Sequence, residues 1–466
     1  MGICCSSGGS TQTPPLLILA VLVLLYLVRA ATAVPTAAAT APPPATSTIS
    51  VILWLGTNSA SSQAPHLLLL ALLFCLFLLR EVAALPFCAQ DDSPGYVAIP
   101  FTKRASSERV HTLSRRQFDT SLNLNSYIHY DVDVQIGNQS LTMVMDTGSY
   151  DIWMYDRQAH DPTHSSTVAN RSDLGYFRPS DMDFTSPPVG YYVADDFAIG
   201  GISANVIIGV ATFAQRGRLP SGVLGLAPAD GVFGECSERK KYPGYIDALV
   251  SQGSIEVGAF SIFLDKLSSR RGTIIFGGQD PSKYSGKLTA FPIAVRPNES
   301  RTCELDIQRP TISYTTNGQA HPVPSSQNYT VIFDTGTPLT FLPKKEFSTI
   351  ASALGAAPIF SGHFEHVVDC AYAGASGGLA FTFSGSNGST TISVPWKELV
   401  IPDKRLAAGS CRFGLAPDSD SLDLYIFGDT FLRSAYVLYN YDEGSISLAP
   451  ASYVSNCTDC VQPLRR

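Results

Sequence analysis

The tripeptide Asp-Thr-Gly occurs twice in this sequence of 466 residues, each time at the end of an apolar run. Asp146-Thr147-Gly148 follows "LTMVM", and Asp334-Thr335-Gly336 follows "TVIF". A carboxylate at the end of a buried strand is costly to ionise without partners. Two such carboxylates that face each other share one proton, because like charges about 3 Å apart do not both ionise readily. One then acts as a general base towards water, and the other donates a proton to a substrate carbonyl.

The residues that follow each aspartate are of the types that such a pair needs. The glycine lets the backbone turn tightly and directs an N–H group at the carboxylate. The next residue, Ser or Thr, can donate a hydroxyl hydrogen bond, and the central threonines can join the two loops. A common turn would not be expected to recur in this way, since the tripeptide arises at about 10⁻⁴ of positions at average composition. We therefore expect a catalytic pair, Asp146 and Asp334, supported by Thr147, Gly148, Ser149, Thr335, Gly336 and Thr337.

The elements that must position these aspartates are mostly strands. Apolar residues make up 45% of the chain and charged residues only 15%, and Gly 37 and Pro 31 favour strands punctuated by turns. The stretch "YDVDVQIG" (130–137) alternates strictly, and helical periodicity is rare outside 245–250 and 347–354. A net charge of −7 without a basic face argues against nucleic-acid binding. The composition and these patterns predict a β-rich protein.

The body also contains a weak internal repeat. The first Asp-Thr-Gly is followed by "VLG" (223–225) and the second by "IFG" (426–428), both of them two apolar residues and a glycine. This pattern indicates two similar β halves, each of which brings one aspartate to the end of a buried strand.

Residues 1–85 are expected to lie outside that body, as a signal or anchor and low-complexity region. The two apolar runs, 16–28 and 67–79, are shorter than the roughly 20 residues that span a bilayer as a helix. Their length fits the apolar region of a signal peptide, and small residues follow both. Retention as a membrane anchor is the alternative, and "MGICCS" also matches a lipidation pattern.

A polar segment, 86–116, carries two basic pairs, Lys103-Arg104 and Arg115-Arg116, which are typical of removable pro-segments. We expect this segment to be dispensable to the folded body. Passage through the secretory pathway is further indicated by six glycosylation sequons, at Asn138, Asn170, Asn298, Asn328, Asn387 and Asn456.

Six of the ten cysteines lie in the body, and an even number in a secreted body implies disulfides and not metal ligands. They are Cys236, Cys303, Cys370, Cys411, Cys457 and Cys460.

From about residue 127 to 452 the chain resembles pepsin-type aspartic endopeptidases, in particular their secreted fungal branch. Besides both Asp-Thr-Gly motifs, the resemblance rests on Trp153, on "FSIFLDKLSSRRGTIIFGGQDPSKYSGKLTAFPI" (260–293) and on "FGDTFLRSAYVLYNYDEGSISLAP" (427–450). It implies an all-β, bilobal, pepsin-like acid protease fold with two pseudo-symmetric β-barrel-like lobes and a cleft between them. The lobes would cover 117–293 and 294–452, and a tail would cover 453–466.

The resemblance also implies roles and partners. Asp146 and Asp334 would be the catalytic pair, and Cys370 and Cys411 would form a disulfide. The substrates would be polypeptides, the pro-segment would be a partner of its own body, and the protein would be a monomer with no metal ion or organic cofactor. Three pairings remain open for the other body cysteines, Cys236, Cys303, Cys457 and Cys460.

One region departs from the family pattern. The family's first lobe has a β-hairpin flap with a tyrosine, but here Met182 or Asp183 stands at that position and Pro187-Pro188 at the tip. We still expect residues 181–197 to form a hairpin over the cleft. Tyr150 and Pro338 also replace small polar residues. Two functions therefore compete. The intact aspartates favour a secreted acid endopeptidase, whereas the unusual flap favours a catalytically weak or inactive binding protein or inhibitor of the same fold.

Overall fold

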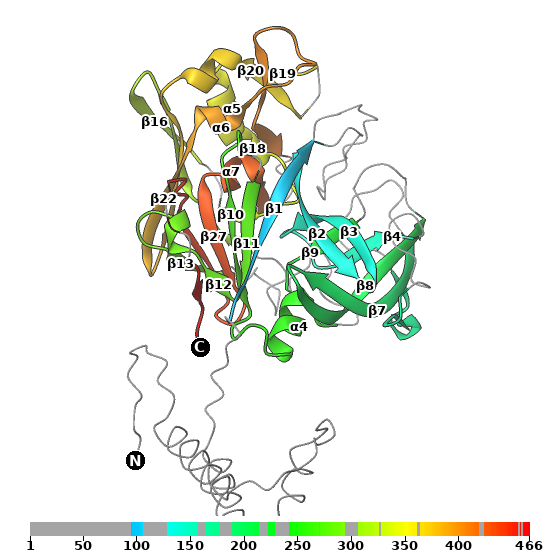
Figure 1. Ribbon diagram of the computed structural model, residues 1–466. Coiled ribbons are helices and arrows are strands. Elements are labelled where there is room, and N and C mark those ends of the chain that lie inside the picture. Colours follow the sequence, from blue (N-terminus) through cyan, green and yellow to red (C-terminus); the bar gives the residue numbers. More distant parts are fainter. Residues whose placement is uncertain are drawn as a thin grey trace, which may run out of the picture. The chain divides into compact units, whose positions relative to one another are not determined.

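The computed structural model describes residues 95–105, 128–156, 165–177, 189–213, 222–228, 242–269, 271–293, 306–325, 328–360, 364–418, 424–454, 457 and 460–466 (Figure 1). They all belong to Asp91–Arg466, the second of two units into which the chain divides. The expected signal or anchor region, 1–85, and the sequons Asn298 and Asn456 lie outside the described residues. No helix in the described ranges is long and apolar enough to cross a membrane.

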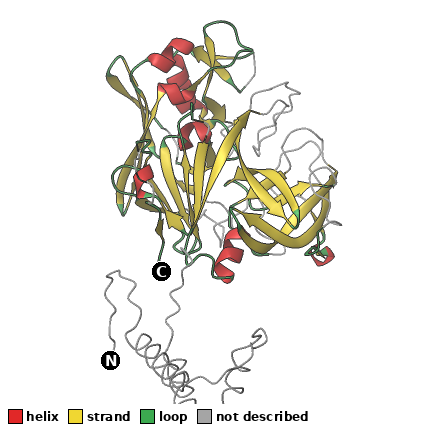
Figure 2. Ribbon diagram, in the orientation of Figure 1, coloured by secondary structure: helices red, strands yellow, loops and turns green. Residues whose placement is uncertain are grey.

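Strands dominate the described part of the chain, and its helices are short (Figure 2). The largest sheet of the described residues has 14 strands and draws on both halves of the sequence. In order across this sheet lie β13 (Thr289–Pro292), β28 (Ser445–Pro450), β27 (Ala435–Asn440), β10 (Ala259–Leu264), β11 (Arg271–Phe276), β1 (Val97–Ala105), β2 (Ile128–Ile136), β3 (Gln139–Asp146), β9 (Gly222–Gly225), β4 (Ile152–Tyr155), β8 (Ile202–Phe213), β7 (Val189–Ile199) and β5 (Ala169–Asn170), and β6 (Tyr176–Phe177) pairs with β7.

The C-terminal half builds smaller sheets. One contains β14 (Asp306–Gln308), β17 (Thr330–Phe333), β26 (Leu424–Phe427), β18 (Thr340–Pro343) and β25 (Leu415–Asp418). A second sheet contains β16 (Gln319–Val323), β15 (Thr311–Thr316), β21 (Gly378–Gly385) and β22 (Gly388–Pro395). A third contains β19 (Ala357–Pro358), β20 (His366–Asp369), β24 (Ser410–Phe413) and β23 (Val400–Ile401). In the expected tail, β29 (Gln462–Pro463) pairs with β12 (Gly278–Gln279).

The two predicted helices are confirmed. They are α4 (Tyr245–Ser251) and α5 (Lys344–Ala353), and Gly355 just beyond α5 has a φ of 63°, a left-handed conformation that favours glycine. The remaining helices of the described ranges are short: α6 (Trp396–Leu399), α7 (Asp429–Leu432) and the 3-10 turns η2 (Ser172–Leu174), η3 (Pro281–Lys283) and η4 (Cys370–Gly374).

The alternating pattern of β2 produces the expected two faces. Val132, Val134 and Ile136 are buried in the main apolar core, while Asp133 and Gln135 between them are exposed. Gly137, with a φ of 54°, turns the chain into β3, which runs antiparallel to β2. The all-β prediction is therefore confirmed, and the hairpin delivers the chain to Asp146.

The predicted repeat has a structural counterpart in strand pairing. β3, which ends at Asp146, runs parallel to β9, so that Asp146 lies opposite Gly225. β17, which ends just before Asp334, runs parallel to β26, so that Phe333 lies opposite Phe427. In both halves the strand that leads into the repeat's glycine, Gly225 or Gly428, is thus the parallel neighbour of the strand that leads into the aspartate.

The expected pro-segment is part of the folded body over 97–105, where the sequence had suggested a dispensable segment. β1 pairs with β11 on one side and with β2 on the other (Figure 1). Val97, Ile99 and Phe101 are buried, whereas Ala98 and Pro100 are exposed. Because this alternation places three apolar side chains in the core, β1 stabilises the large sheet.

Candidate active site

The two predicted aspartates lie together at the ends of their strands. Asp146 is 2% exposed and Asp334 is 3% exposed, and their carboxyl groups are hydrogen-bonded to each other. Each aspartate is also contacted by the opposite loop, because Gly148 packs against Asp334 and Gly336 packs against Asp146. The structure therefore brings together two carboxyl groups that are 188 residues apart in the chain.

Each carboxyl group accepts the same two kinds of donor from its own loop. The N–H of Gly148 donates to Oδ1 of Asp146 at 2.8 Å, and the hydroxyl of Ser149 donates to Oδ2 at 2.6 Å. Around Asp334 the corresponding donors are the Gly336 N–H, at 2.7 Å, and the Thr337 hydroxyl, at 2.5 Å. These bonds orient both carboxyl groups towards each other.

The two central threonines join the loops. The Thr147 hydroxyl donates to the Phe333 carbonyl at 2.8 Å, and the Thr335 hydroxyl donates to the Met145 carbonyl at 2.7 Å. Each hydroxyl also accepts the backbone N–H of the opposite threonine, at 3.0 Å for the Thr147 hydroxyl and 3.2 Å for the Thr335 hydroxyl. All four bonds are buried, so the spacing of the two aspartates is set by direct contacts between the loops.

Burial raises the proton affinity of both carboxyl groups. Burial raises the pKa of Asp146, although hydrogen bonds from Ser149, Asp334 and Gly148 lower it in part. Burial and then the charge of Asp146 raise the pKa of Asp334 well above its usual range. Two buried carboxyl groups this close do not both ionise readily, so the pair shares one proton and titrates as a unit.

The unusual Tyr150 closes one side of the first loop. Its ring lies 5.2 Å from the ring of Tyr242, just before α4, and its hydroxyl donates to the Tyr242 carbonyl. The hydroxyl of Tyr242 in turn donates to Oδ1 of the buried Asp151 at 2.5 Å. Neither Tyr242 nor Asp151 was predicted as part of the site, because nothing in the local sequence links residues 91 positions apart. Pro338, the other unusual residue, accepts the N–H of Thr430 at 3.3 Å.

Of the expected hairpin, 181–197, only 189–197 lie in the described ranges, as part of β7, so its closure over the cleft stays a prediction. β6 pairs with β7, with Tyr176 opposite Tyr191 and Phe177 opposite Gly190. Trp153, which is part of the family pattern, is buried, and its ring centroid lies 6.2 Å from that of Phe177. The positions predicted to replace the flap tyrosine, Met182 and Asp183, and the tip at Pro187-Pro188 fall outside the described ranges.

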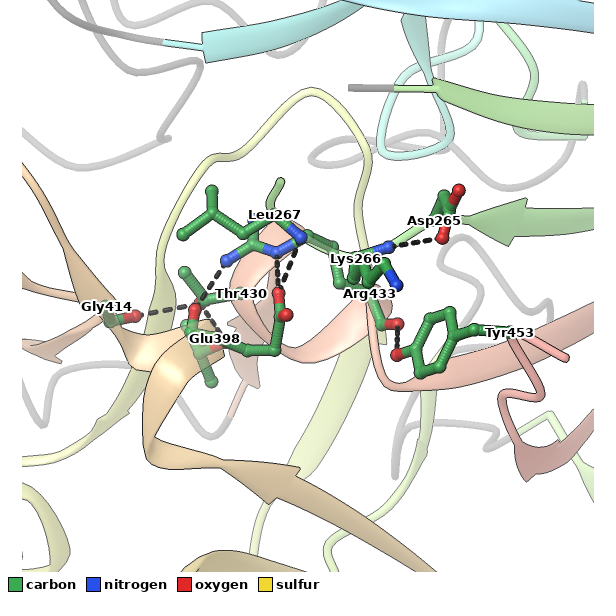
Figure 3. A network of polar contacts seen from close by, with 9 residues as sticks. Asp265, Lys266, Leu267, Glu398, Gly414, Thr430, Arg433 and Tyr453 are labelled. Carbon is green, nitrogen blue, oxygen red and sulfur yellow. Dashed lines mark hydrogen bonds and ion pairs between the residues drawn. The ribbon is translucent and has the colours of Figure 1, made fainter. Parts of the chain in front are cut away.

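A buried ion pair anchors the segment behind the second loop (Figure 3). Arg433, just after α7, donates through Nε to Oε2 of Glu398 at 2.7 Å and through Nη2 to the Glu398 carbonyl. The same Oε2 accepts the N–H of Leu267 at 2.9 Å. At the other end of α7, the N–H of Asp429 donates to the carbonyl of Thr337 at 2.9 Å. Glu398 thus supports the second loop through α7, and no local sequence pattern had indicated it.

Cys370 and Cys411 form a disulfide, with Cα atoms 5.0 Å apart, at the positions that the family resemblance implied. Cys457 pairs with Cys460, which settles that pairing among those left open, and Cys236 and Cys303 lie outside the described residues. No cluster of three or more His, Cys, Asp or Glu side chains suited to a metal ion occurs in the described part of the chain.

Comparisons with known proteins agree with this arrangement. The family described as "Eukaryotic aspartyl protease" matches residues 129–451. Candidapepsin-2 of Candida parapsilosis is 31% identical over 418 residues, which covers 85% of this chain and 93% of the relative. The probable aspartic-type endopeptidase opsB of Aspergillus fumigatus is 31% identical over 396 residues and covers 78% of each chain.

Among solved structures, the aspartic proteinase from Irpex lacteus superposes with a TM-score of 0.59 at 23% identity, over 78% of this chain and all of that chain. This likeness confirms the expected bilobal, pepsin-like all-β fold. Because the family match spans more than half of the sequence, and because relatives above 30% identity cover most of it, the chain belongs to the eukaryotic aspartyl protease family.

Proposed function

We propose that this chain is a secreted acid endopeptidase that hydrolyses peptide bonds with a water molecule activated between Asp146 and Asp334. The observation that carries the proposal is the pair of buried, mutually hydrogen-bonded carboxyl groups, each fixed by an N–H and a hydroxyl from its own loop. An unpaired buried carboxylate would be costly, whereas a pair that shares one proton is suited to acid–base chemistry.

In the proposed cycle the shared proton starts on Asp334. Asp146 accepts a proton from the attacking water while the proton on Asp334 passes to the substrate carbonyl oxygen, which yields a neutral tetrahedral intermediate. Asp146 then delivers its proton to the amide nitrogen, Asp334 recovers its proton from the intermediate's hydroxyl, and the C–N bond breaks. The pair returns to its starting state, so no metal ion or organic cofactor enters the mechanism.

Secretion is proposed from the N-terminal apolar runs, the sequons and the relatives. Secreted aspartic protease 8 of Candida albicans, for example, is 31% identical over 362 residues and covers 73% of this chain. Under this proposal residues 1–85 direct export, 86–116 is a pro-segment, and the mature protein acts on polypeptides as a monomer. The alternative is an anchor retained in residues 1–85.

The second candidate function, a weak or inactive binding protein of the same fold, is favoured only by the sequence of the flap. Cleavage of an acid-denatured protein between pH 3 and 5 separates the two functions. We expect the mature chain to cleave it, and Asp146→Asn and Asp334→Asn each to remove cleavage while retaining the far-UV circular dichroism of the wild type. An inactive wild type that still binds peptides would establish the second function.

A further inference from the structure

A tyrosine hydroxyl lies directly behind the second catalytic loop. Tyr439, on β27, is completely buried, and its hydroxyl donates to the Phe333 carbonyl at 2.8 Å. The same carbonyl accepts the hydroxyl of Thr147 at 2.8 Å, and the two hydroxyl oxygens lie 3.5 Å apart. Phe333 immediately precedes Asp334, so Tyr439 bonds to the peptide group from which the aspartate extends.

That peptide group is held at both ends. Its carbonyl has two hydroxyl donors, and its N–H, from Asp334, donates to the Phe427 carbonyl at 3.1 Å. The equivalent carbonyl of the first loop, that of Met145, accepts the Thr335 hydroxyl but no tyrosine hydroxyl from the described residues. The otherwise symmetric loops are therefore held unequally.

A second tyrosine close to β27 is linked to the first loop, but only through an intervening residue. Tyr441, one residue beyond β27, donates to the carbonyl of Leu226, whose N–H donates to the Asp146 carbonyl at 2.9 Å. The direct bond to the peptide beside a catalytic carboxyl group belongs to Tyr439.

The ring of Tyr439 is itself fixed by the large sheet. It stacks on Phe260 of β10, with centroids 4.7 Å apart and planes at 17°. The two residues lie directly opposite each other, and the same row continues through Phe276 of β11 to Val97 of β1. Because this row crosses four paired strands, shown side by side in Figure 1, the hydroxyl has little freedom to move.

We propose that Tyr439 is a positioning residue for the catalytic pair, which fixes the Phe333–Asp334 peptide and thereby the Asp334 carboxyl group. The inference rests on the proposed function. Without the hydroxyl, the Phe333 carbonyl would lose one of its two hydroxyl donors, and Asp334 would gain freedom of movement. Since a displacement of 1 Å at a reacting group costs about 100-fold in rate, a partial loosening should lower kcat about tenfold.

Tyr439→Phe tests this, because it removes the hydroxyl and leaves the stacked ring. Tyr436→Phe is the matched control. Tyr436 is on the same strand, is equally buried, and its hydroxyl bonds to Ser261 and to the N–H of Asp280, both at 2.7 Å. Since side chains alternate along a strand, Tyr436 faces away from Tyr439.

We expect Tyr439→Phe to lower kcat about tenfold while KM changes less than about twofold, because the bond positions a reacting group and does not bind substrate. The affinity for pepstatin, a mimic of the tetrahedral intermediate, should fall by about the same factor as kcat/KM. Tyr436→Phe should keep kcat and pepstatin affinity within about twofold of the wild type, even with an equal loss of thermal stability.

The inference would be overturned if Tyr439→Phe had the kcat and pepstatin affinity of the wild type, or if Tyr436→Phe lost as much of both. The proposed function would still stand in either case, because the wild type is active. An inactive wild type would overturn both. If Tyr439→Phe does not fold, Phe260→Leu carries the test by removing the stacking partner, with Phe263→Leu, on the opposite face of β10, as its control. A lower kcat in Phe260→Leu alone supports the inference, and equal kcat values oppose it.

Discussion

A β-carbon on Gly148 would lie 2.7 Å from Cγ of Asp334, and one on Gly336 would lie 2.8 Å from Cγ of Asp146. Each glycine is thus the contact surface for the opposite carboxyl group. Such contacts are shorter than carbon atoms tolerate, and neither glycine has a positive φ. The glycines are therefore required because the carboxyl groups approach so closely, and the backbone conformation adds no further demand.

Gly148→Ala and Gly336→Ala should each push the two aspartates apart. We expect kcat/KM at pH 3 to 5 to fall by about 100-fold or more, because a shift of about 1 Å at a reacting group has an effect of that order. The measurement is cleavage of a peptide substrate by the mature chain. Gly374→Ala is the control, since a β-carbon there meets open space. Full activity in Gly148→Ala would show that the pair is not as close as described.

The parts of the site that the sequence predicted are those whose contacting residues lie close together in the chain. Asp146 and Asp334 were found because each stands within a few residues of an apolar strand and of its own hydrogen-bond donors. Phe347 and Ile350 likewise predicted α5 through local periodicity. In each of these cases the residues that make the contact are neighbours in the sequence.

The missed features depend on contacts between distant parts of the chain. Tyr439 bonds to a carbonyl 106 residues away, and Arg433 pairs with Glu398 over 35 residues. A tyrosine in an apolar strand is predicted only to be buried in the core. The hydrogen bond of its hydroxyl depends on an acceptor that the folded chain brings close. β1 was missed because Pro100 and the basic pair hid the alternation of three apolar residues.

The raised pKa values of the two aspartates predict how stability depends on pH. The folded chain binds more protons than the unfolded chain between the ordinary aspartate pKa, about 3.9, and the raised values. Stability therefore falls as pH rises through this window. Asp334→Asn removes one of the two carboxyl groups whose pKa is raised, so it should be more stable than the wild type at pH 7, and the difference should narrow towards pH 4.

Urea unfolding at pH 4, 5.5 and 7 measures this difference. Glu443→Gln, which removes an exposed acid on the turn after β27, should track the wild type at each pH. If the urea midpoint of Asp334→Asn at pH 7 were at or below that of the wild type, ionisation of the buried pair would not destabilise the fold.

The position of β1 predicts which basic pair is processed first. Lys103 and Arg104 lie opposite Tyr130 and His129 in the β1–β2 ladder. A processing protease binds its substrate as an extended chain with free backbone groups, so cleavage after Arg104 would first require β1 to leave the sheet. We expect the first product to begin at Gln117, after Arg116.

N-terminal sequencing of the secreted protein identifies that product. Native mass spectrometry at neutral pH should also find the cleaved segment still bound, because cutting after Arg116 leaves both ladders of β1 intact. Denaturing mass spectrometry should release it. A first product that begins at Ala105 would contradict the prediction.

The last prediction concerns the buried pair of Glu398 and Arg433. Glu398→Ala should destabilise the fold by about 3–5 kcal/mol, because it leaves a buried guanidinium without its carboxylate. The N–H of Leu267 also loses its acceptor.

The exposed pair of Arg171 and Asp173 provides the comparison, since Asp173→Ala should cost at most about 1 kcal/mol. Replacing both members, as Glu398→Leu with Arg433→Met, should cost less than Glu398→Ala, because neither member of the pair is then left buried without the other. Guanidinium unfolding at pH 6 ranks the three proteins. If Glu398→Ala were no less stable than Asp173→Ala, Arg433 would have to find another partner, and the anchor described for α7 would not depend on Glu398.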